Sequence, residues 1–148
     1  MNLFENGHRF GQCARCCPPD NVQGQPLPVP HVVIEMAGGD SDLFVSVTGK
    51  VDTGAVGTML TFQEAHRLGI DNPVLPAPSG TARTATDERF PYYVHDISVQ
   101  IPTDTGEPIE FAMQAAFAER VKRNLFGIDW LQHLCLAVDR QAVYFLRD

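Results

Sequence analysis

The stretch Val51-Asp52-Thr53-Gly54-Ala55 decides how this sequence folds. The residues before it alternate between apolar and polar, which is the spacing of a half-buried β-strand. The two faces of that strand carry Leu43, Val45, Val47 and Val51 on one side and Phe44, Ser46, Thr48 and Lys50 on the other. The strand therefore delivers Asp52 to a tight turn, in which Gly54 lets the backbone fold back closely. The hydroxyl group of Thr53 can brace that turn by hydrogen bonding.

The same Asp-Thr-Gly triplet occurs a second time, as Asp104-Thr105-Gly106, so the triplet alone is a weak motif. The second copy lies in a polar stretch between Pro102 and Pro108. Asp and Gly are common turn residues, and this copy is predicted to be a hairpin turn. Only the first copy has a hydrophobic strand before it and small, apolar residues after it.

Length and charge limit the class of protein. A chain of 148 residues is long enough for one domain with a core and too short for two large lobes. The formal charge of -7, with no basic cluster in view, argues against nucleic-acid binding. No apolar run approaches membrane-spanning length. Residues 1–10 lack the basic-then-apolar order of a signal peptide, so a cytoplasmic protein is expected.

Residues 1–30 are predicted to form a flexible arm ahead of a domain at 31–148. The arm is rich in proline, glycine and glutamine and shows no periodicity. Its cysteines, taken together with His8, suggest half of a zinc site, but structural zinc needs four ligands and Cys135 is the one cysteine left. Free thiols are favoured for Cys13, Cys16 and Cys17, and neither a metal nor a cofactor is expected.

The remaining pattern is that of an all-β domain with one or two short helices. Strands are expected at residues 31–36, 43–51, 57–60, 93–101, 109–117, 135–138 and 142–146. Thr61 and Glu64 have the spacing of a capping box that starts a helix, and Gly69 is a natural stop. A polar, β-prone stretch from Gly80 is expected to form a long hairpin with its tip near Ala85, Thr86, Asp87 and Glu88.

A second signature comes late, as Asn124-Leu125-Phe126-Gly127-Ile128-Asp129-Trp130-Leu131. Two large apolar residues run into a glycine, and a short helical turn is expected to follow. With Val51 to Ala55, this stretch makes the chain resemble the retropepsin-like aspartic proteases, the single-lobe relatives of pepsin. The interval between Asp52 and Gly127 has room for the hairpin and two strands that the family places there, whereas the interval after Asp104 does not.

The resemblance implies a closed, barrel-like fold and a role for each residue of the first motif. Asp52 would be the catalytic carboxylate, and Thr53 would hydrogen-bond to the loop of a partner subunit. Gly54 would contact substrate through its backbone, with Ala55 completing the loop. Gly127 would lie beneath the loop, in space that a side chain would fill.

For the hairpin, the resemblance implies a flap that covers bound peptide. Its tip would be formed by Ala85, Thr86, Asp87 and Glu88, with Asp87 standing where many relatives have glycine. Asp129 is expected to cap the short helix or to form an ion pair. Trp130 is expected in the core.

Metal-free hydrolysis of a peptide bond by carboxylates needs two of them close together, and this chain supplies one suitable Asp. The economical source of the second is another copy, related by a two-fold axis, with residues 142–146 as an exposed edge at the interface. The expected function is therefore an aspartic endopeptidase acting on peptide or protein substrates as a homodimer. A non-catalytic module for dimerisation or peptide binding is the alternative, and maturation of a larger partner or of the chain itself is a further possibility.

Overall fold

The structure is a computed structural model that describes residues 7–9, 21–22, 25–26, 31–84, 86–101, 107–138 and 142–146, with backbone alone for the first three segments and for residues 136–138 and 142–146. In the N-terminal segment it has three short strands, β1 (Gly7–Arg9), β2 (Asn21–Val22) and β3 (Gln25–Pro26). The main elements are β4 (His31–Gly38), β5 (Val45–Val51), β6 (Met59–Thr61), α1 (Phe62–Arg67), β7 (Gly80–Arg83), β8 (Arg89–Ile101), β9 (Ile109–Ala118), β10 (Leu125–Phe126), η1 (Ile128–Gln132), β11 (Cys135–Val138) and β12 (Ala142–Leu146). The division of the chain at residue 30 stays a prediction.

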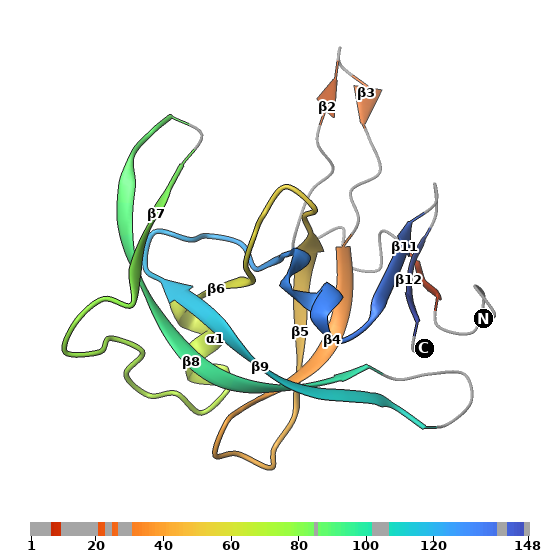
Figure 1. Cartoon of the computed structure of the whole chain (residues 1–148), viewed down its shortest axis with the longest axis horizontal. Coiled ribbons are helices and arrows are strands. Elements are labelled where there is room, and N and C mark those ends of the chain that lie inside the picture. Colours follow the sequence, from red (N-terminus) through yellow and green to blue (C-terminus); the bar gives the residue numbers. More distant parts are fainter. Residues whose placement is uncertain are drawn as a thin grey trace.

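Strands β4, β5, β10, β6, β9 and β8 pair in that order, and β8 pairs back with β4, so the ring of hydrogen-bonded strands closes. β7 extends the ring as a hairpin partner of β8 (Figure 1). Two of the pairings are parallel, β5 with β10 and β6 with β9, and the others are antiparallel. The prediction of an all-β, closed barrel-like domain is confirmed.

The β4–β5 hairpin forms as the alternation predicts, with Met36 opposite Val45 and His31 opposite Lys50. Val47 and Val51 are buried in the core. The expected start of the second strand at Leu43 is wrong, because pairing begins at Val45 and the Leu43 side chain is 74% exposed. A period of two marks which side chains share a face, but it does not mark where the partner strand ends.

β8 and β9 are the two longest strands, and they pair with each other as a hairpin of the barrel. Ile97, Val99 and Ile101 are at most 1% exposed, as their spacing predicts. The pairing runs from Tyr93 opposite Phe117 to Ile101 opposite Ile109. The expected turn with Asp104-Thr105-Gly106 lies outside the described residues.

Helix α1 begins at its predicted cap. The Thr61 hydroxyl accepts a hydrogen bond from the backbone N–H of Glu64 at 3.1 Å, and Gly69 follows the helix with a φ of 84°. In a capping box the Glu64 side chain would accept a hydrogen bond from the Thr61 N–H, but here a different residue accepts it. Asn124 Oδ1 accepts from the Thr61 N–H at 3.1 Å, while the Glu64 carboxylate bonds Asn124 and Arg67. The start of α1 is thereby tied to the segment before β10.

The C-terminal hairpin, β11 with β12, is confirmed, but its exposed edge is not. β1 pairs along β12, with His8 opposite Val143, so β12 is the middle strand of a three-stranded sheet. The predicted use of residues 142–146 as a free edge is therefore wrong, because that edge is already paired.

Within the described residues, no helix has the length and apolar character to cross a membrane.

Candidate active site

Asp52 follows directly on β5, at the point where β10 is inserted beside it. Phe126 of β10 lies opposite Val51 in a parallel pairing. The next hydrogen bond of this ladder runs from the Asp52 N–H to the Phe126 carbonyl oxygen at 2.9 Å. The backbone position of the acid is thus fixed by a strand that is distant in sequence.

The turn after Asp52 holds the carboxylate through its own backbone. The Gly54 N–H donates to Asp52 Oδ1 at 2.9 Å, and the Ala55 N–H donates to the Asp52 carbonyl oxygen at 3.1 Å. The Asp52 side chain is half-buried, whereas Thr53 and Gly54 are exposed. In the described part of the chain, neither Asp52 Oδ2 nor the Thr53 hydroxyl has a hydrogen-bond partner. One carboxylate oxygen is therefore oriented by the loop, and the other makes no hydrogen bond to the described residues.

Gly127 lies against this loop, where only glycine fits. A Cβ added to it would lie 2.6 Å from the Gly57 carbonyl carbon and 2.8 Å from the Ala55 carbonyl oxygen. The Ile128 N–H also donates to that Ala55 oxygen at 2.9 Å. Because the contacting atoms are backbone, they cannot yield as a flexible side chain could.

The far end of the loop is held by Asp129, which sequence reasoning placed in a different role. Asp129 Oδ2 accepts from the Thr58 N–H and Asp129 Oδ1 from the Thr58 hydroxyl, both at 2.8 Å. The Gly127 N–H in turn donates to the Thr58 hydroxyl at 3.2 Å. No cap of η1 by a side chain and no ion pair of Asp129 is present among the described residues. The expected cap or ion pair is wrong, since the carboxylate instead spans two segments.

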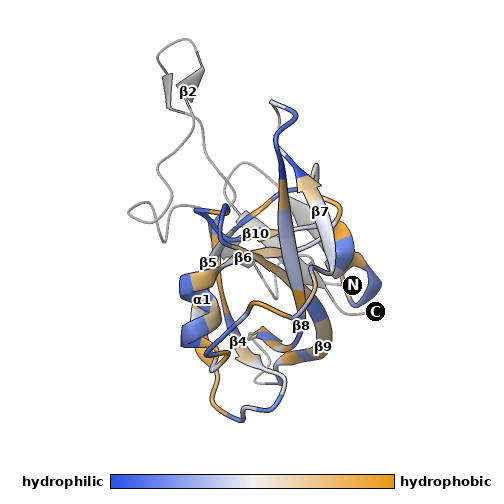
Figure 2. Ribbon diagram, turned by 90° about the vertical axis from the view of Figure 1, so that its left-hand side faces the viewer, coloured by the Kyte–Doolittle hydropathy of each residue, from blue (hydrophilic) through white to orange (hydrophobic). Residues whose placement is uncertain are grey.

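β7 and β8 form the predicted hairpin, which projects beyond the barrel and is hydrophilic at its tip (Figure 2). The Thr84 N–H donates to the Glu88 carbonyl oxygen at 2.8 Å, and the Asp87 N–H donates to the Thr84 carbonyl oxygen at 3.0 Å. Asp87 has a φ of 66°, the left-handed conformation that favours glycine. Thr86 and Glu88 are exposed, and Ala85 lies outside the described residues.

Two ion pairs hold the end of this hairpin at the surface. Arg83 lies 3.4 Å from Asp87 across the turn. Glu88 pairs with Arg120, which belongs to the connection between β9 and β10. The hairpin is therefore tied to the neighbouring wall by exposed side chains.

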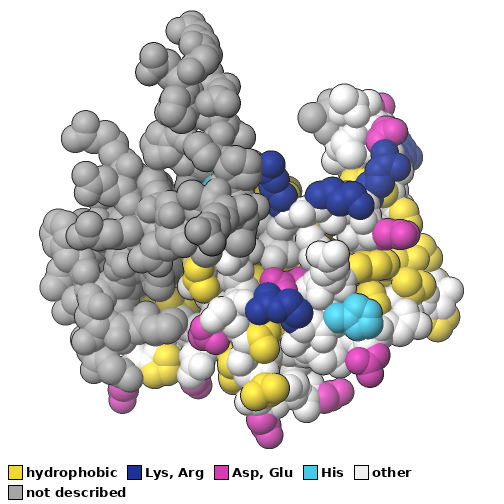
Figure 3. All heavy atoms as spheres, turned by 180° about the vertical axis from the view of Figure 1, so that it is seen from behind, with side chains coloured by type: hydrophobic (Ala, Val, Ile, Leu, Met, Phe, Trp, Pro, Cys, Tyr) yellow, Lys and Arg dark blue, Asp and Glu magenta, His cyan; other side chains and the backbone are white. Residues whose placement is uncertain are grey.

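A cavity of about 1210 Å³ lies between the Asp52 loop, the hairpin and the connection from β9 to β10. It is lined from the loop by Gly54 to Met59, from the hairpin by residues such as Phe90 and Tyr92, and from the connection by residues 120–123. Seen from behind, Lys and Arg side chains gather at and below the projecting hairpin (Figure 3).

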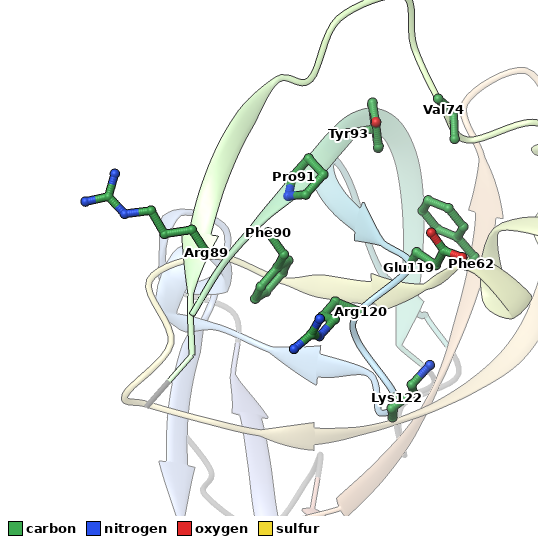
Figure 4. A pocket seen from close by; sticks show the side chains of 9 residues that line it. All are labelled: Phe62, Val74, Arg89, Phe90, Pro91, Tyr93, Glu119, Arg120 and Lys122. Carbon is green, nitrogen blue, oxygen red and sulfur yellow. The ribbon is translucent and has the colours of Figure 1, made fainter. Parts of the chain in front are cut away.

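A second, smaller cavity of about 470 Å³ lies on the other face of β8. Side chains alternate along the strand, so that Tyr92 and Val94 line only the large cavity, whereas Arg89, Pro91 and Tyr93 line only the small one. Phe90, Arg120 and Lys122 border both. Figure 4 shows the side chain of Arg89 pointing away from Arg120 and Lys122.

No protein-family profile matches the sequence, and no curated protein matches it significantly. Solved structures do resemble it. EIAV protease complexed with the inhibitor HBY-793 is 15% identical with a TM-score of 0.51, over 70% of this chain and 86% of that one.

A retropepsin-like aspartic protease from Rickettsia conorii is 22% identical with a TM-score of 0.50, over 78% of this chain and 82% of that one. The retroviral protease-like domain of Ddi1 from Leishmania major is 17% identical with a TM-score of 0.40, over 80% of this chain and 96% of that one. At such identities the likeness concerns architecture. The chain has the fold of the retropepsin-like aspartic proteases, as its two sequence motifs predict.

Proposed function

We propose that this protein is an aspartic endopeptidase that hydrolyses peptide bonds in extended substrates. The observation that carries the proposal is the placement of Asp52. A strand delivers the acid to a loop at the edge of a cavity, and the Gly54 N–H at 2.9 Å orients one carboxylate oxygen. Orientation of a reacting group before substrate arrives is what general acid–base catalysis needs.

The second carboxylate is proposed to come from Asp52 of another copy, across a two-fold axis. The exposed Thr53 hydroxyl supports this, because it is available to a partner loop. The surface beside it is apolar: Val56 is 81% exposed, Leu131 53% and Ile128 38%. Apolar side chains left uncovered next to a site that needs a second acid favour an interface at this place.

In the proposed mechanism the paired carboxylates share one proton, because two like charges in contact cannot both ionise readily. The ionised member takes a proton from a water molecule, and the protonated member polarises the scissile carbonyl group. The β7–β8 hairpin would cover the bound peptide and exclude bulk water.

The test is digestion of a library of extended peptides by the wild type and by Asp52→Asn. Loss of the general acid–base group is expected to lower cleavage by about 10³-fold. Asp104→Asn is the matched control, since it alters the same triplet at the position predicted to be a turn, and it should cleave normally. Equal activity of wild type and Asp52→Asn would end the proposal, and peptide binding without cleavage would indicate the binding module.

A mixing experiment tests the shared site. Asp52→Asn added in equal amount to the wild type should reduce its activity to about half, because mixed dimers hold a single acid. A subunit that works alone would keep its full activity. Sedimentation that shows only monomer while cleavage persists would also contradict the dimer.

A further inference from the structure

The large cavity has the opposite charge from the chain as a whole. The sequence has 18 acidic against 11 basic residues. The cavity lining instead holds four cations, Arg83, Arg120, Lys122 and Arg123, against two carboxylates, Glu88 and Asp129. Because the chain as a whole is anionic and this cavity is lined mainly by cations, an acidic ligand is attracted to the cavity and repelled by most of the remaining surface.

Most of these charges are already engaged within the protein. Asp129 accepts two hydrogen bonds from Thr58, and Glu88 pairs with Arg120. Arg83 pairs with Asp87 at the end of the hairpin. Among the described residues, no ion pair involves the exposed side chains of Lys122 and Arg123. Lys122 and Arg123 thus make no ion pair with the described residues, although Glu119 lines the small cavity together with Lys122.

The chain segment that carries these two side chains is anchored by hydrogen bonds. Asn124, next to Arg123, donates to the Thr48 carbonyl oxygen at 2.9 Å and to Glu64 Oε1 at 3.0 Å, and it accepts from the Thr61 N–H at 3.1 Å. β10 then begins at Leu125 and runs beside the strand that ends at Asp52. The cations are therefore carried by an anchored segment near the loop and not by a free one.

We propose that Lys122 and Arg123 select substrates with an acidic side chain close to the scissile bond. This rests on the proposed peptidase function and names its substrate class. Glutamate fits the lining well, because its methylene groups can lie against Val121 and Leu125 while its carboxylate reaches the cations. In a two-fold dimer the cationic wall occurs twice, so acidic residues are favoured on both sides of the cleaved bond.

The first test compares matched peptides that differ by glutamate or glutamine at the position most enriched in acid among library products. At pH 7 and low salt we expect kcat/KM to be about fivefold higher for glutamate, the range of an exposed ion pair. The preference should fade in about 1 M NaCl, which screens exposed charges. It should also vanish near pH 3, where the glutamate of the substrate is protonated.

Charge reversal identifies the residues. The double variant Lys122→Glu/Arg123→Glu should favour lysine over glutamate in the same peptide series. Arg89→Glu is the matched control, because it reverses one positive charge on the hairpin outside the large cavity, and the glutamate preference should persist. Cleavage that is indifferent to glutamate, or a preference that survives the double reversal, would overturn the inference.

Binding separates this inference from the peptidase proposal. The glutamate and glutamine peptides, labelled with a fluorophore, are titrated against Asp52→Asn with and without the double reversal. Tighter binding of glutamate that depends on Lys122 and Arg123 would support the inference even if the wild type cleaves nothing. Equal binding of both peptides would refute it, whatever the activity of the wild type.

Discussion

The loop that carries Asp52 and the hairpin tip across the cavity are held in opposite ways. The loop is held by buried contacts. Gly127 packs against the Gly57 and Ala55 carbonyl groups, and Thr58, which is 1% exposed, donates a hydrogen bond from its hydroxyl to Asp129. The hairpin tip is held by two exposed ion pairs, Arg83 with Asp87 and Glu88 with Arg120. Buried contacts resist opening, whereas exposed ion pairs contribute little.

The difference teaches which part of the site is fixed and which part can move. In the proposed peptidase the acid has to be oriented before the substrate arrives, and the loop would meet that requirement through contacts that are made once the barrel closes. A hairpin that covers the substrate, as proposed here, would have to open for entry and exit, which weak, solvated contacts would permit. Four substitutions test whether the two regions differ in this way.

The largest effect on stability is expected from Gly127→Ala. Its Cβ would lie 2.6 to 2.8 Å from three backbone atoms, so the loop or β10 has to shift. We expect a loss of about 3 kcal/mol in the free energy of unfolding, measured in urea. The matched control is Gly57→Ala, whose Cβ would meet nothing nearer than Asp129 Oδ2 at 3.9 Å. Equal stability of the two variants would show that the loop is not tightly packed.

Thr58→Val is expected to come second. The substitution keeps the shape but removes the hydroxyl that donates to Asp129 and accepts from the Gly127 N–H. Two polar groups then lose a partner, which costs about 2 kcal/mol in the free energy of unfolding. Thr58→Ser keeps both hydrogen bonds and should lose much less. If valine and serine are equivalent there, the contact between Thr58 and Asp129 does not stabilise the loop.

In the hairpin, Asp87→Val should have a local effect. A β-branched residue at a φ of 66° costs about 1–2 kcal/mol, whereas Asp87→Gly removes that strain. We expect valine to speed hydrogen exchange of the β7–β8 amides with little change in global unfolding. A global loss as large as that of Gly127→Ala would contradict the separation of the two regions.

The smallest effect is expected from Glu88→Gln, which removes the exposed ion pair with Arg120. An exposed pair contributes at most about 0.5 kcal/mol here. Hydrogen exchange at the hairpin should rise slightly at low salt and match the wild type in about 1 M NaCl. A difference that persists at high salt would mean that Glu88 holds the hairpin by something other than charge.

Local patterns predicted much of the fold. The alternation of Ile97, Val99 and Ile101 identified a strand and its buried face, and Thr61 identified the start of α1. The two motifs of the site were also visible, because each depends on a glycine and its neighbours. What these features share is that the information lies within a few residues of the position predicted.

The errors concern contacts between distant segments. Asp129 bonds Thr58, 71 positions away, and no local pattern distinguishes that contact from a helix cap. Residues 142–146 have the composition of an exposed edge, but the partner strand β1 lies at the other end of the chain. The half of the capping box supplied by Asn124 was missed for the same reason. Pairing over long intervals depends on the closed barrel and not on propensity.

The insertion of β10 between β5 and β6 has a consequence for biosynthesis. Its partners, near residues 50 and 59, leave the ribosome long before residues 125 and 126 do. Until that late strand arrives, the acid at the end of β5 lacks its backbone anchor, and the glycine that supports its loop is not yet made. A nascent chain therefore exposes Asp52 before the contacts that orient its loop can form.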